Sequence, residues 1–250
     1  MNSQKIAIFE TCLNGALFSR TTQATFNVLT RYGYQVHLPK TQVCCGQMHF
    51  NTGYPDLISE MIRSFVKTNI DYDYVVFPSA SCAAMVRENY LELAGGFMSP
   101  TNVHKLASIL NRSFELVEFI DTYHREDVSS SYFPHKVVLH PTCHSVRSLG
   151  LLEPSLRILG SVDGIELITN PTQTTCCGFG GTFSVKNNDV SEAMLEDKVN
   201  SIISLDAQYL VALDNSCLMH IGGGLKEKGS QIKTLHIAEI LASTKESALV

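Results

Sequence analysis

Several features that mark common classes of protein are absent from this sequence of 250 residues. No stretch approaches the roughly 20 apolar residues that a transmembrane helix needs. The opening residues, MNSQKIAIFETCLNG, contain too short an apolar run for a secretory signal. Runs of basic residues are absent and the net charge is −5, which argues against nucleic acid as the main partner, because phosphate binding needs clustered Lys and Arg. We therefore expect a cytoplasmic protein without a transmembrane segment.

Two cofactor signatures are missing as well. No glycine-rich G-x-G-x-x-G fingerprint follows an expected strand, so no nicotinamide or flavin site is predicted in this chain. Neither half contains a Cys-x-x-Cys pair, the usual building block of a structural zinc site. The composition is otherwise that of a folded globular protein, with 44% hydrophobic and 17% charged residues. The length allows two domains of ordinary size.

The eight cysteines of the chain all belong to an internal repeat. Each half carries a Cys-Cys-Gly motif, flanked by segments that match between the halves. In chain order the matched segments are IAIFETC (6–12) with VVLHPTC (137–143), TQVCCGQMHF (41–50) with TTCCGFGG (174–181), and YVVFPSASC (74–82) with YLVALDNSC (209–217). They place Cys12, Cys44, Cys45 and Cys82 in the first half and Cys143, Cys176, Cys177 and Cys217 in the second.

Each half reads as a module in which strands alternate with helices. In the first half KIAIFE, YQVHLP and YVVFPS are apolar runs typical of buried strands, and FELVEFI is a candidate fourth strand. This alternation predicts an α/β fold of two tandem homologous modules, each with a mainly parallel sheet flanked by helices. The boundaries are predicted at 1–128 and 136–250, with a polar, Ser-rich linker over 129–135.

Every cysteine lies just beyond the carboxyl end of an expected strand. Cys12 follows the first strand, Cys44 and Cys45 follow the second, and Cys82 follows the third. The second module repeats this placement. Because the carboxyl ends of parallel strands share one edge of the sheet, where ligands bind in open α/β folds, four thiols are expected to converge in each module.

A converging set of four thiols admits four interpretations. The thiols are buried and inert, bind structural zinc, hold an iron–sulfur cluster, or form the strained disulfide of a thiol–disulfide enzyme. Duplication of the whole set favours a bound metal over inert thiols. Neighbouring residues tend to point their side chains apart, so a Cys-Cys pair suits a cluster of several irons better than one small ion.

Together these motifs resemble the cysteine-rich CCG-domain family. That family includes the B subunit of heterodisulfide reductase and the iron–sulfur subunits of glycolate oxidase and anaerobic glycerol-3-phosphate dehydrogenase. The resemblance spans nearly the whole chain. The stretches that narrow it to the lactate-utilization members are FETCL, CCGQMHFNTGY, PSASCAAMVR, TCCGFGGTFSVK and DNSCLMHIGG.

The resemblance implies an iron–sulfur electron-transfer subunit of a complex that oxidises L-lactate, a 2-hydroxy acid, to pyruvate without NAD. All eight cysteines are then cofactor ligands, with one [4Fe–4S] cluster in each module and zinc as the alternative metal. The implied partners are a ferredoxin-like iron–sulfur subunit and a third subunit. The rival function is a zinc-stabilised binding or scaffold module without redox activity.

The chain departs from the family pattern at one position in each module. The family's last element is Cys-x-x-Cys, and the first of these positions is occupied by Ser79 or Asp214. Four cysteines per module put a five-cysteine, non-cubane cluster in doubt and leave enough thiolates for an ordinary [4Fe–4S] cluster. We expect Ser79 and Asp214 to be helix N-caps, with a carboxylate ligand as the alternative role of Asp214.

Histidines and arginines near the motifs are further candidates. The histidines are His49, His140, His144 and His220. Each is expected to be a surface or hydrogen-bonded side chain, with His144 and His220 preferred for contact with a cluster or substrate because their counterparts in the first module are apolar. Arg87 and Arg147 are candidates for binding an anionic 2-hydroxy acid, although solvated surface positions are the simpler expectation.

Overall fold

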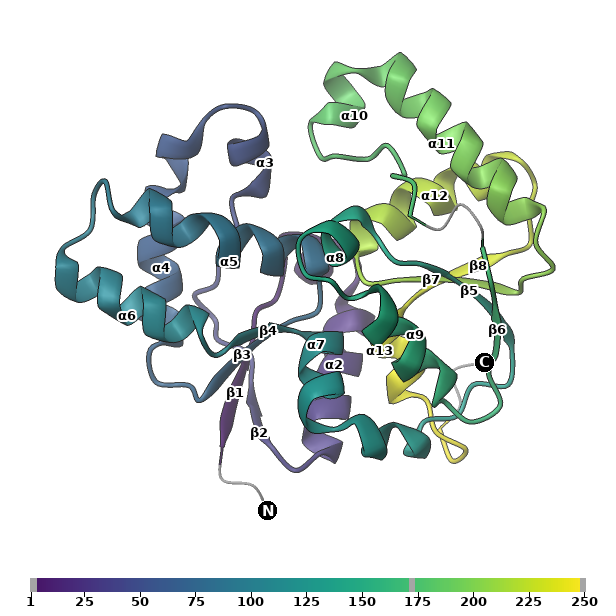
Figure 1. Ribbon diagram of the computed structural model, residues 1–250, viewed down its shortest axis with the longest axis horizontal. Coiled ribbons are helices and arrows are strands. Elements are labelled where there is room, and N and C mark those ends of the chain that lie inside the picture. The colour runs from purple at the N-terminus through teal and green to yellow at the C-terminus, as the bar shows by residue number, and fades with distance from the viewer. Residues whose placement is uncertain (1–3, 171–173, 248–250) are drawn as a thin grey trace. The chain divides into compact units, whose positions relative to one another are not determined.

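The computed structural model describes residues 4–170 and 174–247. By internal packing the chain divides into two compact units, Met1–Phe119 and Ile120–Val250, and each contains one four-stranded parallel sheet flanked by helices (Figure 1). The predicted α/β class with two tandem units is confirmed. The boundaries expected from the repeat, at 128 and 136, stay a prediction.

The first unit carries the strands β1 to β4 and the helices α1 to α7. In chain order they are β1 (Lys5–Ile8), α1 (Cys12–Leu17), α2 (Ser19–Arg31), β2 (Gln35–His37), α3 (Gln47–Asn51), the 3-10 helix η1 (Pro55–Ile58), α4 (Ser59–Asn69), β3 (Tyr74–Phe77), α5 (Ala80–Ala94), α6 (Pro100–Leu110), β4 (Ser113–Glu115) and α7 (Leu116–Tyr123). The division between the units falls inside α7.

The candidate strand FELVEFI is only partly a strand. Its first residues belong to β4, and the chain turns into α7 directly after Glu115. The buried carboxylate of Glu115 accepts hydrogen bonds from the backbone N–H of Val117 (2.5 Å) and of Glu118 (3.3 Å). These are N–H groups that the first turn of a helix leaves without an intrahelical partner, so this side chain favours a helix where the apolar pattern predicted a strand.

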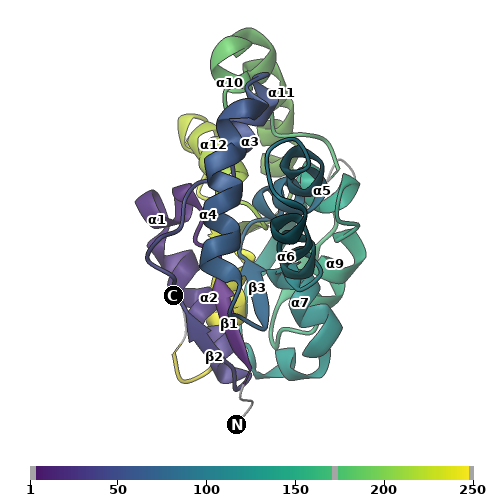
Figure 2. The same cartoon turned by 90° about the vertical axis from the view of Figure 1, so that its left-hand side faces the viewer.

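Helices cover both faces of the first sheet. Helix α2 packs on β1 and β2, whereas α5 packs on β3 and β4. Helices α4, α5 and α6 contact one another, and Figure 2 views the unit from their side, with the strands behind them. This layering buries the central strands beyond their first residues, and Ile6, Ile8, Val75 and Val76 have no exposed surface.

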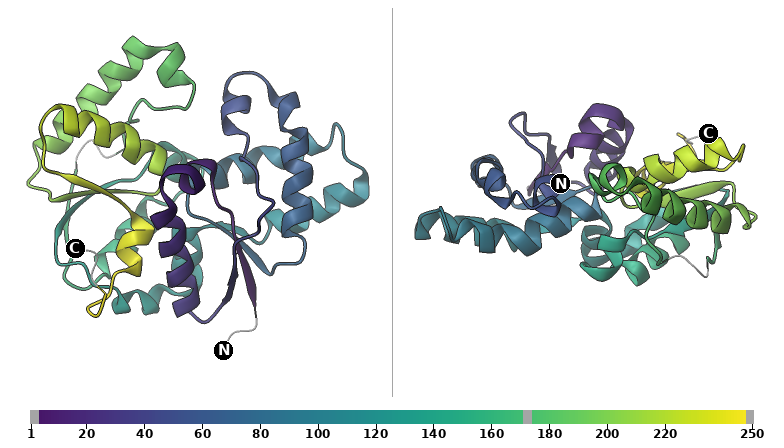
Figure 3. Two further views of the ribbon diagram at one scale, coloured as in Figure 1. Left: turned by 180° about the vertical axis from the view of Figure 1, so that it is seen from behind. Right: turned by 90° about the horizontal axis from the view of Figure 1, so that it is seen from above.

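The second unit repeats the alternation of strands and helices, with one helix in place of two between its third and fourth strands. Its elements are the 3-10 helix η2 (Arg125–Ser130), β5 (Lys136–His140), α8 (Cys143–Arg147), α9 (Leu152–Gly160), β6 (Glu166–Ile168), α10 (Phe183–Lys186), α11 (Asn188–Ile203), β7 (Tyr209–Ala212), α12 (Asn215–Glu227), β8 (Lys233–His236) and α13 (Ile237–Ala242). Helix α12 lies against β7 and β8 and contacts α11 (Figure 3). In the described part of the chain, no helix has the length and apolar character needed to cross a membrane.

The two sheets share one topology. Their strand orders are β2-β1-β3-β4 and β6-β5-β7-β8, and all neighbouring strands pair in parallel. In each sheet the first strand of the unit has the second strand on one side and the third on the other. The direction of chain progression therefore reverses between β1 and β3, and between β5 and β7. Such a reversal opens a crevice at the carboxyl ends of the strands, where ligands bind.

An ion-pair network ties α7 to α9 in the second unit. Asp121 has a side chain only 11% exposed and accepts paired hydrogen bonds from Arg125 (3.0 and 3.1 Å) and from Arg157 (2.8 and 3.4 Å). Burial by itself raises the pKa of the Asp121 carboxyl, but the hydrogen bonds and charges of the two arginines outweigh burial and lower the pKa below its usual value of 3.8.

We expect Asp121→Asn to lower the free energy of unfolding at neutral pH by about 1 kcal/mol, measured by urea unfolding. The loss is small because solvent screens the two half-exposed arginines. A folded-state pKa below the unfolded value stabilises the fold above pH 3.8 and ceases to do so as the pH falls through the folded pKa. The difference between wild type and variant should therefore shrink in acid. Asp206→Asn, which removes a 90% exposed partner of Lys136, is the control and should change little. A difference that is independent of pH would contradict this account.

Candidate metal centres

The four cysteines of the first unit meet at the edge of its sheet. Cys12 begins α1 after β1, Cys44 and Cys45 lie in the loop after β2, and Cys82 lies in the first turn of α5 after β3. The Sγ atoms of Cys12 and Cys44 are 3.8 Å apart, and those of Cys45 and Cys82 are 3.3 Å apart. Cys44 and Cys45 also contact each other through their thiols. The thiols expected to converge do so.

Local hydrogen bonds hold these segments in place. Thr11 caps α1, since its hydroxyl accepts from the N–H of Asn14 at 3.2 Å. The buried side-chain amide of Asn14 in turn donates to the carbonyl of Pro78 at 3.2 Å. This bond links the segment after β1 to the segment after β3, the two strands that flank the crevice. Ser79 caps α5 and accepts from the N–H of Cys82 at 3.3 Å, so the expected N-cap role of Ser79 is confirmed.

Glycine makes the Cys-Cys-Gly turn possible in both units. Gly46 and Gly178 have φ values of 81° and 87°, in the left-handed region that favours glycine. In this conformation the N–H of each glycine donates to the first thiol of its pair, Cys44 or Cys176, at 3.4 Å. A Cβ added at Gly178 would lie 2.7 Å from the carbonyl oxygen of Ser191. The glycine therefore supplies both a backbone conformation and close packing against α11.

We expect Gly178→Ala to destabilise the protein more than Gly229→Ala. Both substitutions place alanine at a positive φ, 87° and 71°, which costs about 1–2 kcal/mol. Only the first adds a clash, because a Cβ at Gly229 meets nothing within 4 Å. Overpacking should add about 1–3 kcal/mol at Gly178. Urea unfolding of the two variants measures the difference, and equal losses would show that the packing against α11 contributes nothing.

The second unit assembles its thiols in the same way. Cys143 begins α8 after β5, Cys176 and Cys177 lie between β6 and α10, and Cys217 lies in the first turn of α12. The Sγ atoms of Cys143 and Cys176 are 3.4 Å apart, and those of Cys177 and Cys217 are 3.3 Å apart. A disulfide needs about 2.05 Å. All eight cysteines of the protein are therefore free thiols.

Hydrogen bonds between neighbouring thiols shift their pKa values in opposite directions. Hydrogen bonds from Cys12 and then Cys45 lower the pKa of Cys44 to about 2, and hydrogen bonds from Cys143 and then Cys177 do the same for Cys176. The hydrogen bond to Cys44 raises the pKa of Cys12, as the one to Cys176 raises that of Cys143. One thiolate is thus favoured and its neighbours are held protonated.

This donor set fits a bound metal. Four thiols in contact ionise together only when a positive charge offsets their repulsion, and a metal cation supplies it. The backbone N–H groups of Gly46 and Gly178 each donate to one sulfur of their set. Hydrogen bonds of this kind support the sulfur ligands of metal centres. The first turns of α5 and α12 place a positive helix end beside Cys82 and Cys217. Cys12 is exposed, so a group bound in the first unit has one side open to solvent.

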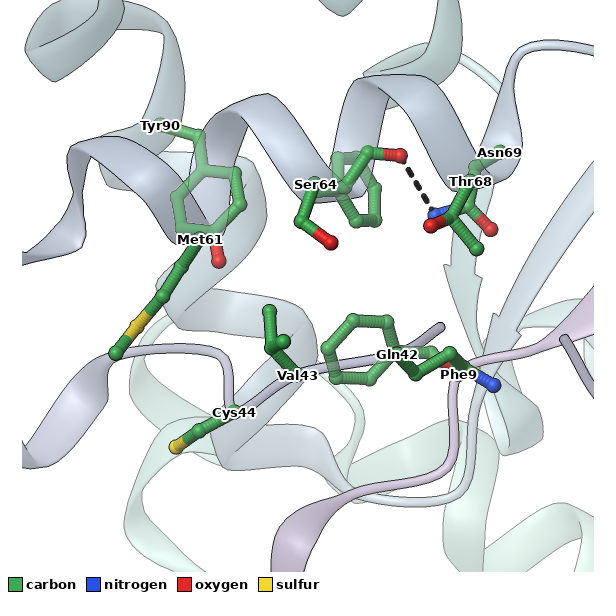
Figure 4. Close-up of a pocket in the computed structure, with 10 residues that line it drawn as sticks. Phe9, Gln42, Val43, Cys44, Met61, Ser64, Thr68, Asn69 and Tyr90 are labelled. Carbon is green, nitrogen blue, oxygen red and sulfur yellow. Dashed lines mark hydrogen bonds between the residues drawn. The ribbon is translucent and has the colours of Figure 1, made fainter. Parts of the chain in front are cut away.

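Two hollows lie beside the thiols of the first unit. One is an open depression of about 340 Å³ lined by Cys12, Cys44, Glu10 and Lys40 among others. The second, of about 10 Å³, lies between the Cys-Cys-Gly loop and α4 and is shown in Figure 4. This hollow has room for about one water molecule and is too small for a substrate. The open depression is therefore the larger approach to this set of thiols.

An aromatic wall stands behind the thiols of the first unit. Phe9 stacks on Phe77 with ring centroids 4.7 Å apart and lies 6.0 Å from Phe65, which in turn meets Tyr90 edge-on at 5.6 Å. The hydroxyl of Tyr90 donates to the carbonyl of Cys45 at 3.0 Å. Tyr90 is 1% exposed. The wall therefore both packs the core and fixes the Cys-Cys-Gly loop.

The second unit replaces this wall with smaller and polar residues. In the repeat, Phe9 corresponds to His140, Phe77 to Ala212 and Tyr90 to Leu225. Phe65 corresponds to Lys198. Met61 and Met194 occupy equivalent places, because each lies beside the glycine of its Cys-Cys-Gly motif. Phe65 follows the first methionine, and Lys198 the second, by the same number of residues. His140 and Lys198 are both buried, each with 2% of its surface exposed.

His140 and Lys198 both lie near the second set of thiols. Burial lowers the pKa of His140 to about 3, and the charge of Lys198 acts in the same direction. Burial also lowers the pKa of Lys198, whereas the charges of all four cysteines of the unit raise it. An imidazole and an ammonium group thus occupy positions that are aromatic in the first unit.

The two histidines preferred from the sequence lie outside the compact group that His140 forms with Cys177 and Cys217. His220 is half-buried, 3.5 Å from the hydroxyl of Ser191, and packs on Phe179. His144 is half-buried as well. The preference for these two stays a prediction, and His140 is added to it because a ring nitrogen of His140 lies within 4.8 Å of the sulfurs of Cys177 and Cys217. Comparison of buried positions between the repeats, aromatic in one and polar in the other, is the signal that finds both His140 and Lys198.

Three further candidates have ordinary structural positions. Asp214 is the N-cap residue of α12 and is buried, although no hydrogen bond from its side chain to the helix N-terminus is present. Arg87 forms a half-buried ion pair with Glu118. Arg147 is exposed at the end of α8. Arg147 thus matches the expectation of a solvated surface position, whereas Arg87 is held in an ion pair.

Comparison with known proteins agrees with the repeat. The model of the cysteine-rich domain family, CCG, matches residues 6–87 and 137–222. Lactate utilization protein A of Geobacillus sp. (strain WCH70) is 39% identical over 240 residues, which cover 96% of this chain and 99% of that protein. Lactate utilization protein A of Oceanobacillus iheyensis is 35% identical over 246 residues, with 98% and 99% covered.

One solved structure is a much weaker match. Glutamate racemase isoform RacE1 from Bacillus anthracis aligns with 96% of this chain and 79% of its own, at 9% identity and a TM-score of 0.36. This likeness carries no weight for the fold or the site. The cysteine sets are therefore described by the family match and by their own geometry.

Proposed function

The chain belongs to the cysteine-rich CCG domain family and, within it, to the relatives of Lactate utilization protein A, and from this we propose that it is an iron–sulfur electron-transfer subunit of a complex that oxidises L-lactate to pyruvate. A cytoplasmic location and two partners are part of the proposal. The partners are a ferredoxin-like iron–sulfur subunit and a third subunit. The reaction removes two electrons and two protons from lactate and does not use NAD.

The observation that carries the proposal is the contact among four thiols in each of two repeated units. In each unit the thiols come from the carboxyl ends of three strands, and adjacent thiols lie 3.3–3.8 Å apart without forming a disulfide. Free thiolates are the usual ligands of iron–sulfur clusters. The eight cysteines are therefore proposed to hold one [4Fe–4S] cluster per unit. When bound, such a cluster would accept and release single electrons.

The protein's own residues prepare the site for an anionic group. Gly46 and Gly178 direct N–H groups at Cys44 and Cys176, and the N-termini of α5 and α12 lie beside Cys82 and Cys217. Such donors stabilise negative charge on the sulfurs and thereby tune the potential of the centre. The exposure of Cys12 and the depression beside it give an electron partner access to the first unit.

A zinc-stabilised scaffold is the second candidate, and a specific observation favours it. With Zn–S bonds of about 2.3 Å, a tetrahedral site places sulfurs about 3.8 Å apart, close to the separation of Cys12 and Cys44, 3.8 Å. Relatives named for lactate utilization favour redox chemistry instead. The two candidates differ in the metal that the purified protein contains.

Anaerobically purified protein is expected to contain iron and sulfide. It should be brown, because iron–sulfur clusters absorb broadly near about 400 nm. Cys45→Ser and Cys177→Ser should each remove about half of the iron, because each buried thiol belongs to one unit only. Arg147→Ser, an exposed change beside the second set, is the control and should retain all of it. Colourless protein with stoichiometric zinc would establish the scaffold alternative.

With the two proposed partner subunits present, L-lactate is expected to bleach the absorbance of the protein near about 400 nm, where iron–sulfur clusters absorb, and D-lactate is expected to do so more weakly. Bleaching reports electrons that reach the metal centres of this chain. The double variant Cys45→Ser, Cys177→Ser should abolish it while the other subunits keep their own absorbance. Iron-loaded complex that L-lactate leaves unreduced would refute lactate as the electron source and leave the metal assignment standing.

A further inference from the structure

One of the buried positions at which the two candidate centres differ carries a possible metal ligand. His140 ends β5 in the second unit, and Phe9 follows β1 at the corresponding place in the first. Phe9 offers a ring face to Phe77 and Phe65 and no ligand atom. His140 offers two nitrogens. The repeat has therefore kept the thiols and changed the group beside them.

The imidazole of His140 lies with two of the thiols in a compact group. A ring nitrogen of His140 and the sulfurs of Cys177 and Cys217 are all within 4.8 Å of one another, and all three residues are buried. Among the described residues, this is the only group of three or more His, Cys, Asp or Glu side chains with ligand atoms so close. Metal–ligand bonds of about 2.0–2.3 Å span such a group after small adjustments.

Both ring nitrogens of His140 are buried without a hydrogen-bond partner among the described residues. Buried polar groups are nearly always hydrogen-bonded or bound to an ion, because an unsatisfied one costs free energy. The nearby ammonium group of Lys198 is a donor only, and no hydrogen bond joins the two. A metal cation on the thiol side would satisfy one nitrogen lone pair.

The backbone between His140 and the first cysteine of the unit is unusual in the same place. Thr142 has φ 59° and ψ 150°, and no other non-glycine residue in the described ranges has a positive φ. Its counterpart Thr11 has an ordinary φ of −72°. Such a conformation costs about 1–3 kcal/mol and persists where the surroundings hold it. It orients the short segment that connects His140 to Cys143.

We propose that His140 is a nitrogen ligand of the metal centre in the second unit, alongside Cys177 and Cys217, so that the two centres are chemically different. The inference rests on the proposed function, since it requires that the thiols hold a metal. The first centre is bound by thiolates, whereas the second has thiolate and imidazole ligands. A neutral imidazole carries less negative charge than a thiolate, and histidine ligation raises the potential of iron–sulfur centres. The second centre therefore has the higher reduction potential.

The experiment uses full-length, anaerobically purified protein in which histidine alone is labelled with ¹⁵N. Pulsed electron paramagnetic resonance of the reduced protein should show a nitrogen coupling that changes with the label, and of a size typical of a direct bond to the metal. The unmodified sequence is used, so folding is not in question. The signal should disappear in His140→Phe, which copies the first unit and has space because Ala212 stands where the first unit has Phe77.

His220→Phe is the matched control, because it removes another half-buried histidine of the same unit. It should retain the labelled coupling. In redox titrations His140→Phe should lower the potential of one of the two centres, and His220→Phe should shift neither comparably. Loss of the nitrogen coupling in His140→Phe alone would separate metal ligation from a packing role. If His140 only packed against its neighbours, its replacement would remove no nitrogen coupling.

The outcomes distinguish this inference from the proposed function. Iron-containing, paramagnetic protein without a histidine-dependent coupling overturns the ligation by His140 and leaves the iron–sulfur function intact. The same holds if the coupling survives in His140→Phe. Protein that contains no iron overturns the proposed function, and the ligation of a cluster by His140 fails with it.

Discussion

The rest of each site depends on the contact among four thiols at one edge of the sheet. Three parallel strands end at one edge in each unit, and the cysteines that follow them have nowhere to lie but against one another. Hydrogen bonds from neighbouring thiols lower the pKa of Cys44 and Cys176, and the pKa of Cys12 and of Cys143 is raised in turn. Ionisation of further thiols would bring like charges together, and a bound metal cation would offset their repulsion. The N–H groups of the motif glycines and the helix N-termini beside Cys82 and Cys217 favour negative charge on the sulfurs.

Duplication of the unit separates what the site requires from what it can vary. Both units keep the strand order, the left-handed glycine and its N–H bond to the first thiol of the pair. The wall behind the thiols is not kept: Phe9 and Phe65 pack as rings in one unit, and His140 and Lys198 replace them in the other. The thiol geometry is thus common to both units, and the electrostatic surroundings distinguish them. Two centres with different surroundings have different potentials.

Much of the fold could be predicted because it follows from local patterns. Short segments show the strand and helix periods and the repeated cysteine motifs. The alternation of strands with helices then indicates a parallel sheet. The strand predicted at FELVEFI was wrong beyond Glu115, because a buried carboxylate caps a helix there and the apolar period does not report on side-chain capping. Ser79 was predictable as a cap because serine before a helix is a local signal. Asp214 occupies the same place without making the same bond.

The sequence by itself determined that eight cysteines form two sets of four, and that each set lies at the carboxyl edge of a parallel sheet. Spacing and periodicity suffice for this, since parallel strands align their ends. Only the tertiary structure decided which histidine reaches the sulfurs and that a lysine of α11 is buried near them. The physical reason is that His140 and Lys198 approach the thiols from a strand and a helix far apart in the chain. Their proximity depends on side-chain packing between those elements, which no local pattern encodes.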